Sequence, residues 1–235
     1  MRRFGSSSII RIIEYLCKYN NVNNMLTKVI EFYAKYGELI ILDTGDFLIF
    51  DQNISYYIWI LSGKLHLSKS AKNSKLINLV FLKSNDRLIL YNSTNLIYQI
   101  KAFEQCHILI LNSYLIPKLV TIYPLKSFFI LKGITSYCDK IQAFSRIYFP
   151  RNVSYRIIIL LLLLVKYFGY NSISGIEISL SISQDNIAQI VGTTRVTVTR
   201  IFNILQRKKC IEINSNKITI KNLIYLATIL HIKNL

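Results

Sequence analysis

The segment Ser183–Leu205 restricts the fold of this chain more than any other, because it holds two short helical patterns on either side of a glycine. Ser183 can cap the first helix, Gly192 can end it, and Thr194 can cap the second. The residues expected on the buried sides are Ile187, Ala188, Ile190 and Val191 in the first helix, and Val198, Ile201, Phe202 and Leu205 in the second.

The stretch "TTRVTVTR", residues 193–200, would be taken for a strand on propensity alone, because valine and threonine favour strands. Its surroundings favour a helix, since it follows a tight glycine-containing turn and begins the second amphipathic pattern. Two short helices joined in this way, with a polar face at the start of the second, are typical of a helix-turn-helix.

Four side chains share the face of the second helix that lies opposite its apolar residues. An arginine can donate two hydrogen bonds to guanine O6 and N7, and a valine methyl group can pack on the thymine methyl group. Adjacent Arg195 and Val196 therefore suit a G and a T. The residues predicted to read bases are Arg195, Val196, Thr199 and Arg200.

A second set of residues is suited to phosphate contacts, which fix the register on DNA without reading its sequence. The starts of the two helices offer hydroxyls, an amide and backbone N–H groups. The alternating "CIEI" and "KITI" around "NSN" predict a hairpin that would be the wing of a winged helix. The predicted phosphate contacts are Ser183, Gln184, Thr194, Thr197 and Lys217.

The charge of the chain points to a polyanionic partner. Lysine and arginine outnumber aspartate and glutamate by 29 to 12, a formal net charge of +17. Nucleic acid fits this charge best, and an anionic membrane surface comes second. The helix-turn-helix pattern makes double-stranded DNA the predicted partner. The most apolar run, Ile157–Val165, is about half the roughly 20 residues that span a bilayer, so we expect a buried helix and no membrane insertion.

No catalytic or metal-binding pattern is present in the sequence. The four cysteines are scattered and form no CxxC pair or Cys/His cluster, so we predict no zinc, iron–sulfur or disulfide framework. The three histidines, His66, His107 and His231, are isolated from one another and from paired carboxylates. We therefore predict a protein that is not an enzyme and has no catalytic residue and no metal.

The chain is predicted to have an α+β fold in four parts. Short apolar runs from Gly37 to about Leu111, separated by Gly, Asp, Asn and Ser, indicate an N-terminal β-roll. The predicted parts are an effector-like β-roll domain at 1–125, a long dimerisation helix at 126–148, a winged helix-turn-helix DNA-binding domain at 149–222, and a C-terminal helix or tail at 223–235.

The predicted dimerisation helix carries a heptad-like seam. Its apolar residues recur with alternating spacings of four and three, as in helices that pair with a copy of themselves. The seam consists of Ile130, Ile134, Tyr137, Ile141 and Phe144, and continues to Tyr148. The same periodicity also fits an amphipathic helix that lies on its own β-domain.

The run "ISQDNIAQIVGTTRVTVTRIFNILQRKKCIEINSNKITI" resembles the C-terminal domain of the cyclic-AMP receptor/FNR family of transcription regulators. The resemblance is specific over residues 183–221 and weaker, but in the same order, from Gly37 to Phe149. It implies a jelly-roll domain like those that bind cyclic nucleotides, a dimerisation helix and a winged helix.

Within that family, residues 193–200 are similar to the cyanobacterial nitrogen regulators. This likeness implies a homodimer on a palindromic GTA/TAC operator, a role in nitrogen control, and RNA polymerase as a further partner. The predicted function is a sequence-specific DNA-binding transcription regulator. The alternative is a basic module that binds nucleic acid or membrane surfaces without reading sequence.

The effector site is where the chain departs from the family. The resemblance implies a glycine-containing cassette that holds an anion such as 2-oxoglutarate, but residues 85–103 contain no glycine. Leu96 and Tyr137 stand where the resemblance implies arginines. We therefore predict no cofactor, with the effector unknown and Arg87 as the candidate residue of an altered anion site.

The amino-acid composition, which reflects codon usage, bears on the cellular compartment. Ile, Asn, Lys, Tyr and Phe are abundant, which is typical of an A/T-rich genome. With the likeness to cyanobacterial regulators and no recognisable transit peptide, this favours the plastid (chloroplast) stroma, and the alternative is a bacterial cytoplasm.

Overall fold

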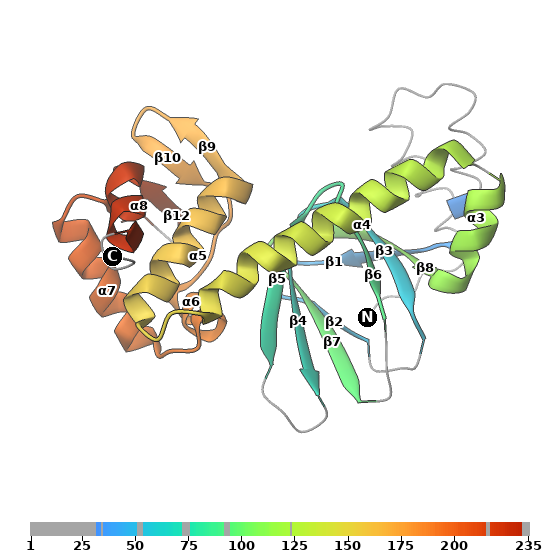
Figure 1. Ribbon diagram of the computed structural model, residues 1–235, viewed down its shortest axis with the longest axis horizontal. Coiled ribbons are helices and arrows are strands. Elements are labelled where there is room, and N and C mark those ends of the chain that lie inside the picture. Colours follow the sequence, from blue (N-terminus) through green and yellow to red (C-terminus); the bar gives the residue numbers. More distant parts are fainter. Residues whose placement is uncertain are drawn as a thin grey trace. The chain divides into compact units, whose positions relative to one another are not determined.

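The computed structural model describes residues 32–33, 35–50, 54–71, 76–91, 95–122, 124–214 and 217–231. The chain divides into two compact units, Met1–Lys140 and Ile141–Leu235 (Figure 1). The boundary falls inside α4, Pro124–Ser145, and not at residue 149 as the sequence suggested. The reason is that the end of α4 packs in the C-terminal unit, where Phe144 stacks on Tyr167 with ring centroids 5.7 Å apart.

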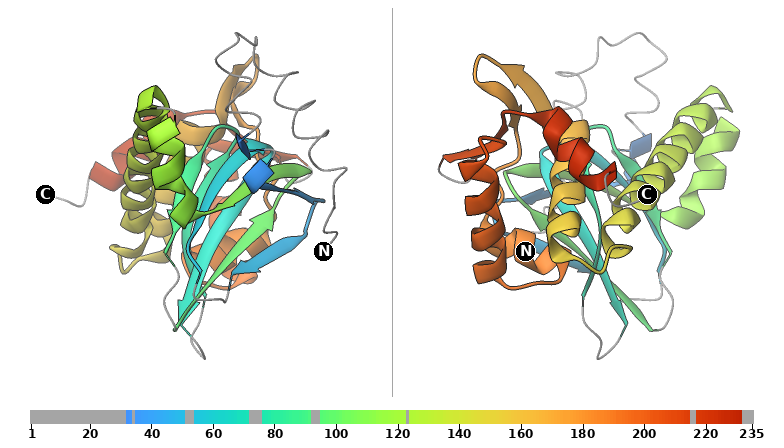
Figure 2. Two further views of the ribbon diagram at one scale, coloured as in Figure 1. Left: turned by 90° about the vertical axis from the view of Figure 1, so that its right-hand side faces the viewer. Right: turned by 60° about the vertical axis from the view of Figure 1, so that its left-hand side comes forward.

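The N-terminal unit contains two antiparallel four-stranded sheets, which confirms the predicted β-roll (Figures 1 and 2). One sheet has the order β1-β8-β3-β6, with strands Glu38–Leu42, Cys106–Asn112, Tyr56–Ser62 and Arg87–Leu90. The other has the order β2-β7-β4-β5, with strands Phe47–Phe50, Leu96–Ala102, Lys64–Ala71 and Ile77–Lys83.

Buried apolar residues of both sheets form the core of this unit, and in β3, β4 and β8 consecutive residues are buried. Ile58 and Ile60 of β3 and Leu65 and Leu67 of β4 are fully buried. Strand neighbours such as β1 and β8 are far apart in the sequence, so the pairing was not predictable from local turns.

His66 of β4 lies within this core and carries no charge at neutral pH. Its ring centroid is 4.7 Å from that of Phe81 and 6.5 Å from that of Phe103. Burial, with a smaller contribution from Lys101, lowers its pKa from 6.5 to about 3. The isolated histidine of the sequence is therefore a core residue.

We expect the stability of the N-terminal unit to fall as the pH is lowered from 6.5 towards 3, because unfolded His66 takes up a proton that the folded state excludes. The loss from this residue between pH 7 and pH 5 should be about 2 kcal/mol. Urea unfolding measured at both pH values checks it. The His66→Phe variant should lose this part of the pH dependence, and an unchanged dependence would contradict the assignment.

Three helical elements follow the roll: η1, Ser113–Leu115; α3, Ile116–Ile122; and α4. Ile130 of α4 is buried in a core cluster with Tyr57 of β3 and Leu109 and Leu111 of β8, and Ile134 packs against that cluster. The predicted seam is therefore at least partly an intrachain surface.

The dimerisation prediction for Ile130 and Phe144 is wrong as stated. Both side chains are buried within a single chain, at 6% and 3% exposure, so neither is available to a partner helix. Ile134, Tyr137 and Ile141 are half-buried. The alternative that the sequence left open, an amphipathic helix lying on its own β-domain, accounts for Ile130 and Ile134, whereas Phe144 packs in the C-terminal unit.

The C-terminal unit places helices around a four-stranded sheet of order β11-β12-β10-β9. Its elements are η2, Arg146–Tyr148; α5, Val153–Phe168; β9, Gly169–Ser172; β10, Gly175–Ile178; α6, Gln184–Val191; α7, Arg195–Arg207; β11, Ile211–Asn214; β12, Lys217–Ile220; and α8, Leu223–His231. The predicted α5 and the hairpin of β11 and β12 are confirmed.

Strand β9 was not predicted, because its sequence, "GYNS", lacks alternating apolar residues. Gly169 makes the abrupt change from helix to strand possible, since a Cβ there would lie 2.4 Å from the Val165 carbonyl oxygen. No helix in the described part of the chain is both long and apolar enough to cross a membrane.

Candidate nucleic-acid interface

The helix pair α6–α7 forms with the caps that the sequence predicts. Ser183 Oγ accepts a hydrogen bond from the Asn186 backbone N–H at 3.2 Å, and Thr194 Oγ1 accepts one from the Thr197 N–H at 3.3 Å. Gly192 ends α6 in the left-handed region, with φ of 73°. The stretch that resembled a strand is helix α7.

The buried sides of α6 and α7 are those that the periodicity predicts. The buried residues are Ile187, Ala188, Ile190 and Val191 in α6, and Val198, Ile201, Phe202 and Leu205 in α7. Because these residues pack inward, the opposite face of α7 lies at the surface of the C-terminal unit (Figure 2). Arg195 and Arg200 are exposed there, and Val196 is 78% exposed.

Val196 lies next to Arg195 in the first turn of α7. Arg195 is also exposed and pairs with Asp185 at an N–O distance of 3.6 Å. Their side chains are 68% and 57% exposed, so the pair is weak and DNA can displace it. Asp185 is a residue whose contact with Arg195 the sequence analysis missed.

Thr199, one of the predicted base readers, also makes contacts within the helix pair. Its hydroxyl donates to Gln184 Oε1 of α6 and lies 3.0 Å from the Arg195 carbonyl oxygen. A threonine hydroxyl has one proton to donate, so this group stabilises the contact between the two helices.

The predicted phosphate-contacting residues lie near the starts of the two helices. Gln184 accepts through Oε1, which leaves its amide N–H groups for an anion. The hydroxyls of Thr194 and Thr197 are 3.0 Å apart at the start of α7. Both helix N-termini favour negative charge through their free backbone N–H groups.

The wing offers a further cation. Lys217 is exposed at the start of β12, next to the turn of the hairpin. Lys221, at the other end, pairs with Glu212 at 2.6 Å. Lys217 is therefore better placed for a phosphate contact than Lys221.

Two supporting residues, Arg156 and Tyr148, were not identified from the sequence. Arg156 of α5 donates from Nε to the Pro150 carbonyl oxygen at 2.7 Å and from Nη1 to the Val191 carbonyl oxygen at 3.3 Å. Tyr148 Oη donates to the Ile190 carbonyl oxygen at 3.3 Å. These bonds connect the end of α6 to residues 148–156, and so they fix the orientation of the helix pair.

Asn203 is another exposed residue that the sequence analysis passed over. It lies three residues after Arg200 and seven after Val196, so it shares their face of α7. That spacing is the signal that could have identified it. Asparagine can read adenine or contact a phosphate.

Arg87, the candidate effector residue, is engaged within the N-terminal unit. Its guanidinium lies 4.6 Å from the centroid of the Trp59 ring. Its side chain also packs against α4 at Gly133, where an added Cβ would lie 2.7 Å from Arg87 Cβ. The close approach explains a glycine inside this helix.

Next to Arg87, a buried ion pair joins the turn before β6 to α4. Lys140 Nζ lies 2.6 and 2.5 Å from the two carboxylate oxygens of Asp86, and the side chains are only 7% and 13% exposed. Burial lowers the pKa of Lys140, and Asp86 partly opposes that shift. Asp86 also accepts from the Lys83 N–H at 2.7 Å. We call Asp86, Arg87, Gly133 and Lys140 the α4 clamp.

Sequence comparison places the C-terminal unit among known domains. Residues 155–229 match the model of the Crp-like helix-turn-helix domain. A protein of Porphyra purpurea named as an HTH-type transcriptional regulator, ycf28, is 32% identical over 188 residues, 79% of each chain. The global nitrogen regulator of Nostoc sp. strain PCC 7120 is 29% identical over 167 residues, 69% of this chain and 75% of that protein.

Solved structures share the fold. A mutant of CooA from Carboxydothermus hydrogenoformans superposes with a TM-score of 0.68 at 19% identity, covering 83% of this chain and 88% of that one. The c-di-GMP-responsive regulator CLP of Xanthomonas campestris gives 0.65 at 16% identity, covering 84% and 99%. At these identities the likeness concerns the fold alone.

Proposed function

Because this chain belongs to the family of Crp-like helix-turn-helix transcription regulators, we propose that it is a homodimer that reads a palindromic GTA/TAC operator. The family assignment makes it a DNA-binding transcription regulator. The operator sequence, the dimer and a role in nitrogen control are the finer parts of the proposal.

One observation carries the operator proposal: Arg195 and Val196 are adjacent and exposed in the first turn of α7, on the face opposite its core. A recognition helix contacts bases with the residues of its first turns. The arginine fork suits guanine and the valine methyl groups suit the neighbouring thymine, so the pair favours GT over other steps.

A dimer requires a self-complementary surface, and α4 offers one on its outer face. Phe128 and Leu131 are 65% and 61% exposed. Thr135, Cys138 and Gln142 are also exposed and continue the spacing of three and four residues. We call Phe128, Leu131, Thr135, Cys138 and Gln142 the outer stripe. We propose that this stripe, and not the heptad-like seam predicted from the sequence, forms the contact between the two copies of α4.

Cys138 allows the proposed stripe to be tested. In a parallel pair of helices related by a two-fold axis, a residue of the seam faces its own copy. Mild oxidation with copper–phenanthroline should remove one hydrogen from each Cys138 thiol and join the two chains by a disulfide. We expect most of the protein to run as a covalent dimer on a non-reducing gel.

Both proteins carry Cys17→Ser, because Cys17 lies outside the described residues. In this background the Cys138→Ser variant is the matched control and should remain monomeric on the gel, since Cys106 and Cys210 are buried. A wild-type protein that resists cross-linking at concentrations where it binds operator would contradict the stripe. A variant that cross-links as fast as wild type would contradict it as well.

We also propose that the α4 clamp replaces an effector in this chain. Arg87 is the candidate residue of an altered anion site, but here Trp59, Gly133 and the Lys140–Asp86 pair already hold this part of α4 on the roll. DNA binding should then be independent of 2-oxoglutarate and cyclic nucleotides.

Selection of bound duplexes from a random pool tests the proposed function. The recovered sequences should share a GTA/TAC palindrome whose half-sites are about one helical turn apart. The same palindrome and the same yield are expected with and without 2-oxoglutarate. Recovery of unrelated duplexes would contradict sequence reading and would favour the basic interaction module.

The cellular setting is the least direct part of the proposal. The relatives named above support a plastid stroma or a bacterial cytoplasm as the compartment. RNA polymerase is the partner through which a regulator bound at a promoter would act.

A further inference from the structure

Helix α5 has one apolar side that the described part of its unit does not fully cover. The sequence of α5 is apolar over most of its length, and a helix that is apolar all round is normally buried on every side. Yet Tyr155, Ile159 and Leu162 are only half-buried. Their spacing of four and three residues puts them in one row along the helix.

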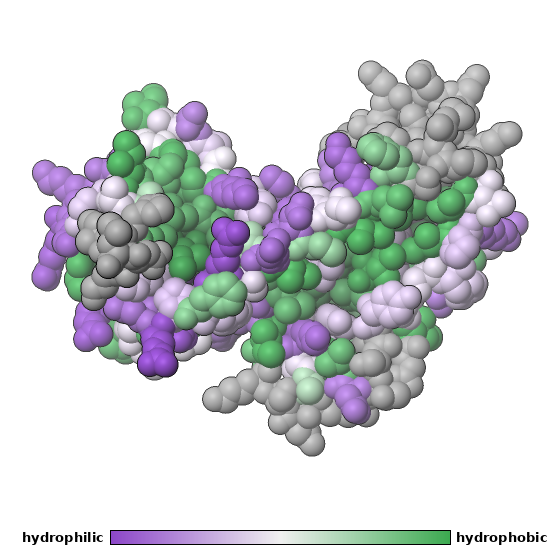
Figure 3. All heavy atoms as spheres, viewed as in Figure 1, coloured by the Kyte–Doolittle hydropathy of each residue, from purple (hydrophilic) through white to green (hydrophobic). Residues whose placement is uncertain are grey.

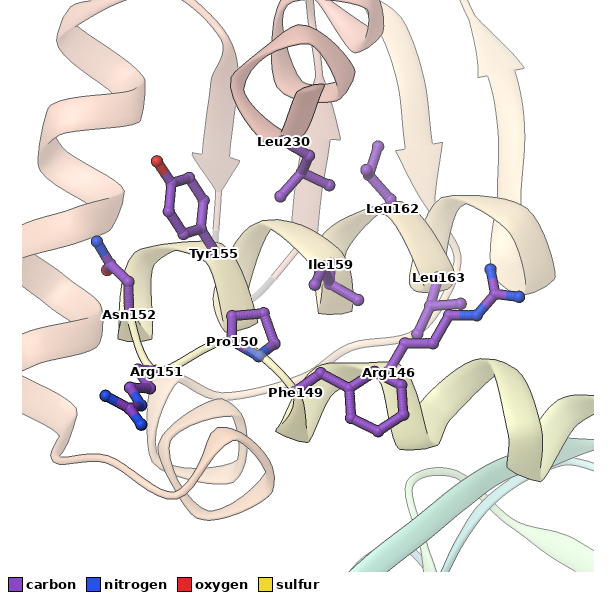
Figure 4. A pocket seen from close by; sticks show the side chains of 10 residues that line it. All are labelled: Arg146, Phe149, Pro150, Arg151, Asn152, Tyr155, Ile159, Leu162, Leu163 and Leu230. Atoms are coloured by element: carbon purple, nitrogen blue, oxygen red, sulfur yellow. The ribbon is translucent and has the colours of Figure 1, made fainter. Parts of the chain in front are cut away.

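This row forms the floor of a groove of about 830 Å³ in the C-terminal unit. Phe149 and Pro150, just before α5, form one wall, and Leu230 of α8 forms the other (Figure 4). Phe149 is 77% exposed. Figure 3 shows apolar residues gathered over α5 and α8, with hydrophilic residues around them.

The charged residues of the groove are both cations. Arg146 and Arg151 line it and are exposed, and no acidic residue lines it. Among the described residues neither arginine takes part in an ion pair. The groove therefore has an apolar floor and two exposed guanidinium groups, which suit a ligand that is apolar on one side and acidic at its edges.

We propose that this groove docks an acidic amphipathic helix of a partner protein. The row from Tyr155 to Leu162 is about 10 Å long, which matches the two turns over which a bound helix presents apolar residues at i, i+3 or i+4, and i+7. Carboxylates beside those residues would meet Arg146 and Arg151, which can bind them bidentately.

The chemistry of the chain itself disfavours a second copy as the occupant. The formal net charge is +17, and in the described helices the acidic residues are Asp139 and Asp185. Asp185 pairs with Arg195, so no described helix combines an apolar stripe with acidic edges. The site lies on α5, whereas DNA reading rests on α7, so the two proposals can fail separately.

The test uses the full-length chain and two fluorescent peptides of identical composition. In the first peptide the leucines lie on one helical face with glutamates on both sides, and in the second the same residues are distributed around the helix. Fluorescence anisotropy should show at least about tenfold tighter binding of the first. Equal affinities would mean that the basic chain merely attracts acidic peptides, which would overturn the proposal.

Three variants make the result specific to the groove. Ile159→Glu and Arg151→Glu should each weaken the binding of the amphipathic peptide about tenfold or more. Lys209→Glu, which removes an exposed cation elsewhere in the same unit, should leave the difference between the peptides unchanged. DNA affinity and thermal unfolding of each variant report on folding, and Arg151→Glu keeps the test valid if Ile159→Glu does not fold.

Two further outcomes decide the nature of the ligand and its independence from DNA reading. Lauric acid is tested as a competing ligand. If it binds the wild type but not Ile159→Glu, and if it displaces the peptide, the groove is a lipid site and the proposal is overturned. Arg195→Ala should bind the amphipathic peptide as wild type does, even though its operator affinity falls. Loss of peptide binding in Arg195→Ala would place the peptide on the DNA surface and would also overturn the proposal.

Discussion

Replacing Arg195 by alanine is expected to weaken binding to a GTA/TAC duplex by about 1–3 kcal/mol for each half-site, roughly a five- to 150-fold loss. The reason is the loss of two hydrogen bonds from one guanidinium to guanine. Binding to a random duplex should change little. Asp185, left without its partner, is 57% exposed, so the folded state should not be destabilised.

Lys217→Ala is the matched control for this experiment, because a phosphate contact carries no sequence information. It should weaken binding to operator and random duplexes about equally. It should also reduce the slope of log K against log salt concentration by about one. Arg195→Lys keeps the charge but lacks the planar fork, so it should also lose the preference for GTA. Equal losses on both duplexes for Arg195→Ala would favour the non-specific basic module.

Replacing Lys140 by methionine is expected to destabilise the N-terminal unit by about 3–5 kcal/mol, because it leaves the Asp86 carboxylate buried without its cation. Urea unfolding followed by the fluorescence of Trp59 measures the change. The Lys64–Glu104 pair of the same unit is the matched control, since its side chains are 21% and 44% exposed. Lys64→Met should cost about 1 kcal/mol or less.

The double variant Asp86→Asn with Lys140→Met tests the cause. Removing both charges removes the uncompensated carboxylate, so the double variant should recover much of the stability that Lys140→Met loses. Additive losses in the double variant would mean that the ion pair does not couple the two residues. The clamp would then have no role in holding α4.

The helix pair α6–α7 was predictable because its signals are local. Ser183, Gly192 and Thr194 mark the helix ends, and the apolar residues between them repeat with helical spacing. The strand propensity of residues 193–200 yields to this spacing, because packing of Val198 and Phe202 outweighs a small local preference.

The α4 clamp could not be predicted because it depends on contacts between distant positions. Asp86 and Lys140 are 54 residues apart in the sequence, and no local pattern links them. The partner against which α4 packs could not be predicted for the same reason. A seam of apolar residues shows that one face of the helix is buried, but not whether the cover is its own domain or a second copy.

Thr199 shows the same limit on a smaller scale. Helical spacing places its side chain beside Arg195, but spacing does not reveal that the Gln184 side chain of the neighbouring helix accepts its hydroxyl proton. Arg195 likewise contacts α6 through its exposed pair with Asp185, which the spacing along α7 does not reveal.

The most direct test of the central claim is a double-mutant cycle between Arg195 and the operator guanine. The duplexes carry either guanine or 7-deazaguanine, which lacks the N7 acceptor, at the GTA position, and both are titrated with wild type and with Arg195→Ala. If Arg195 reads this base, 7-deazaguanine weakens wild-type binding but has almost no effect on Arg195→Ala. An equal loss for the two proteins would contradict the account.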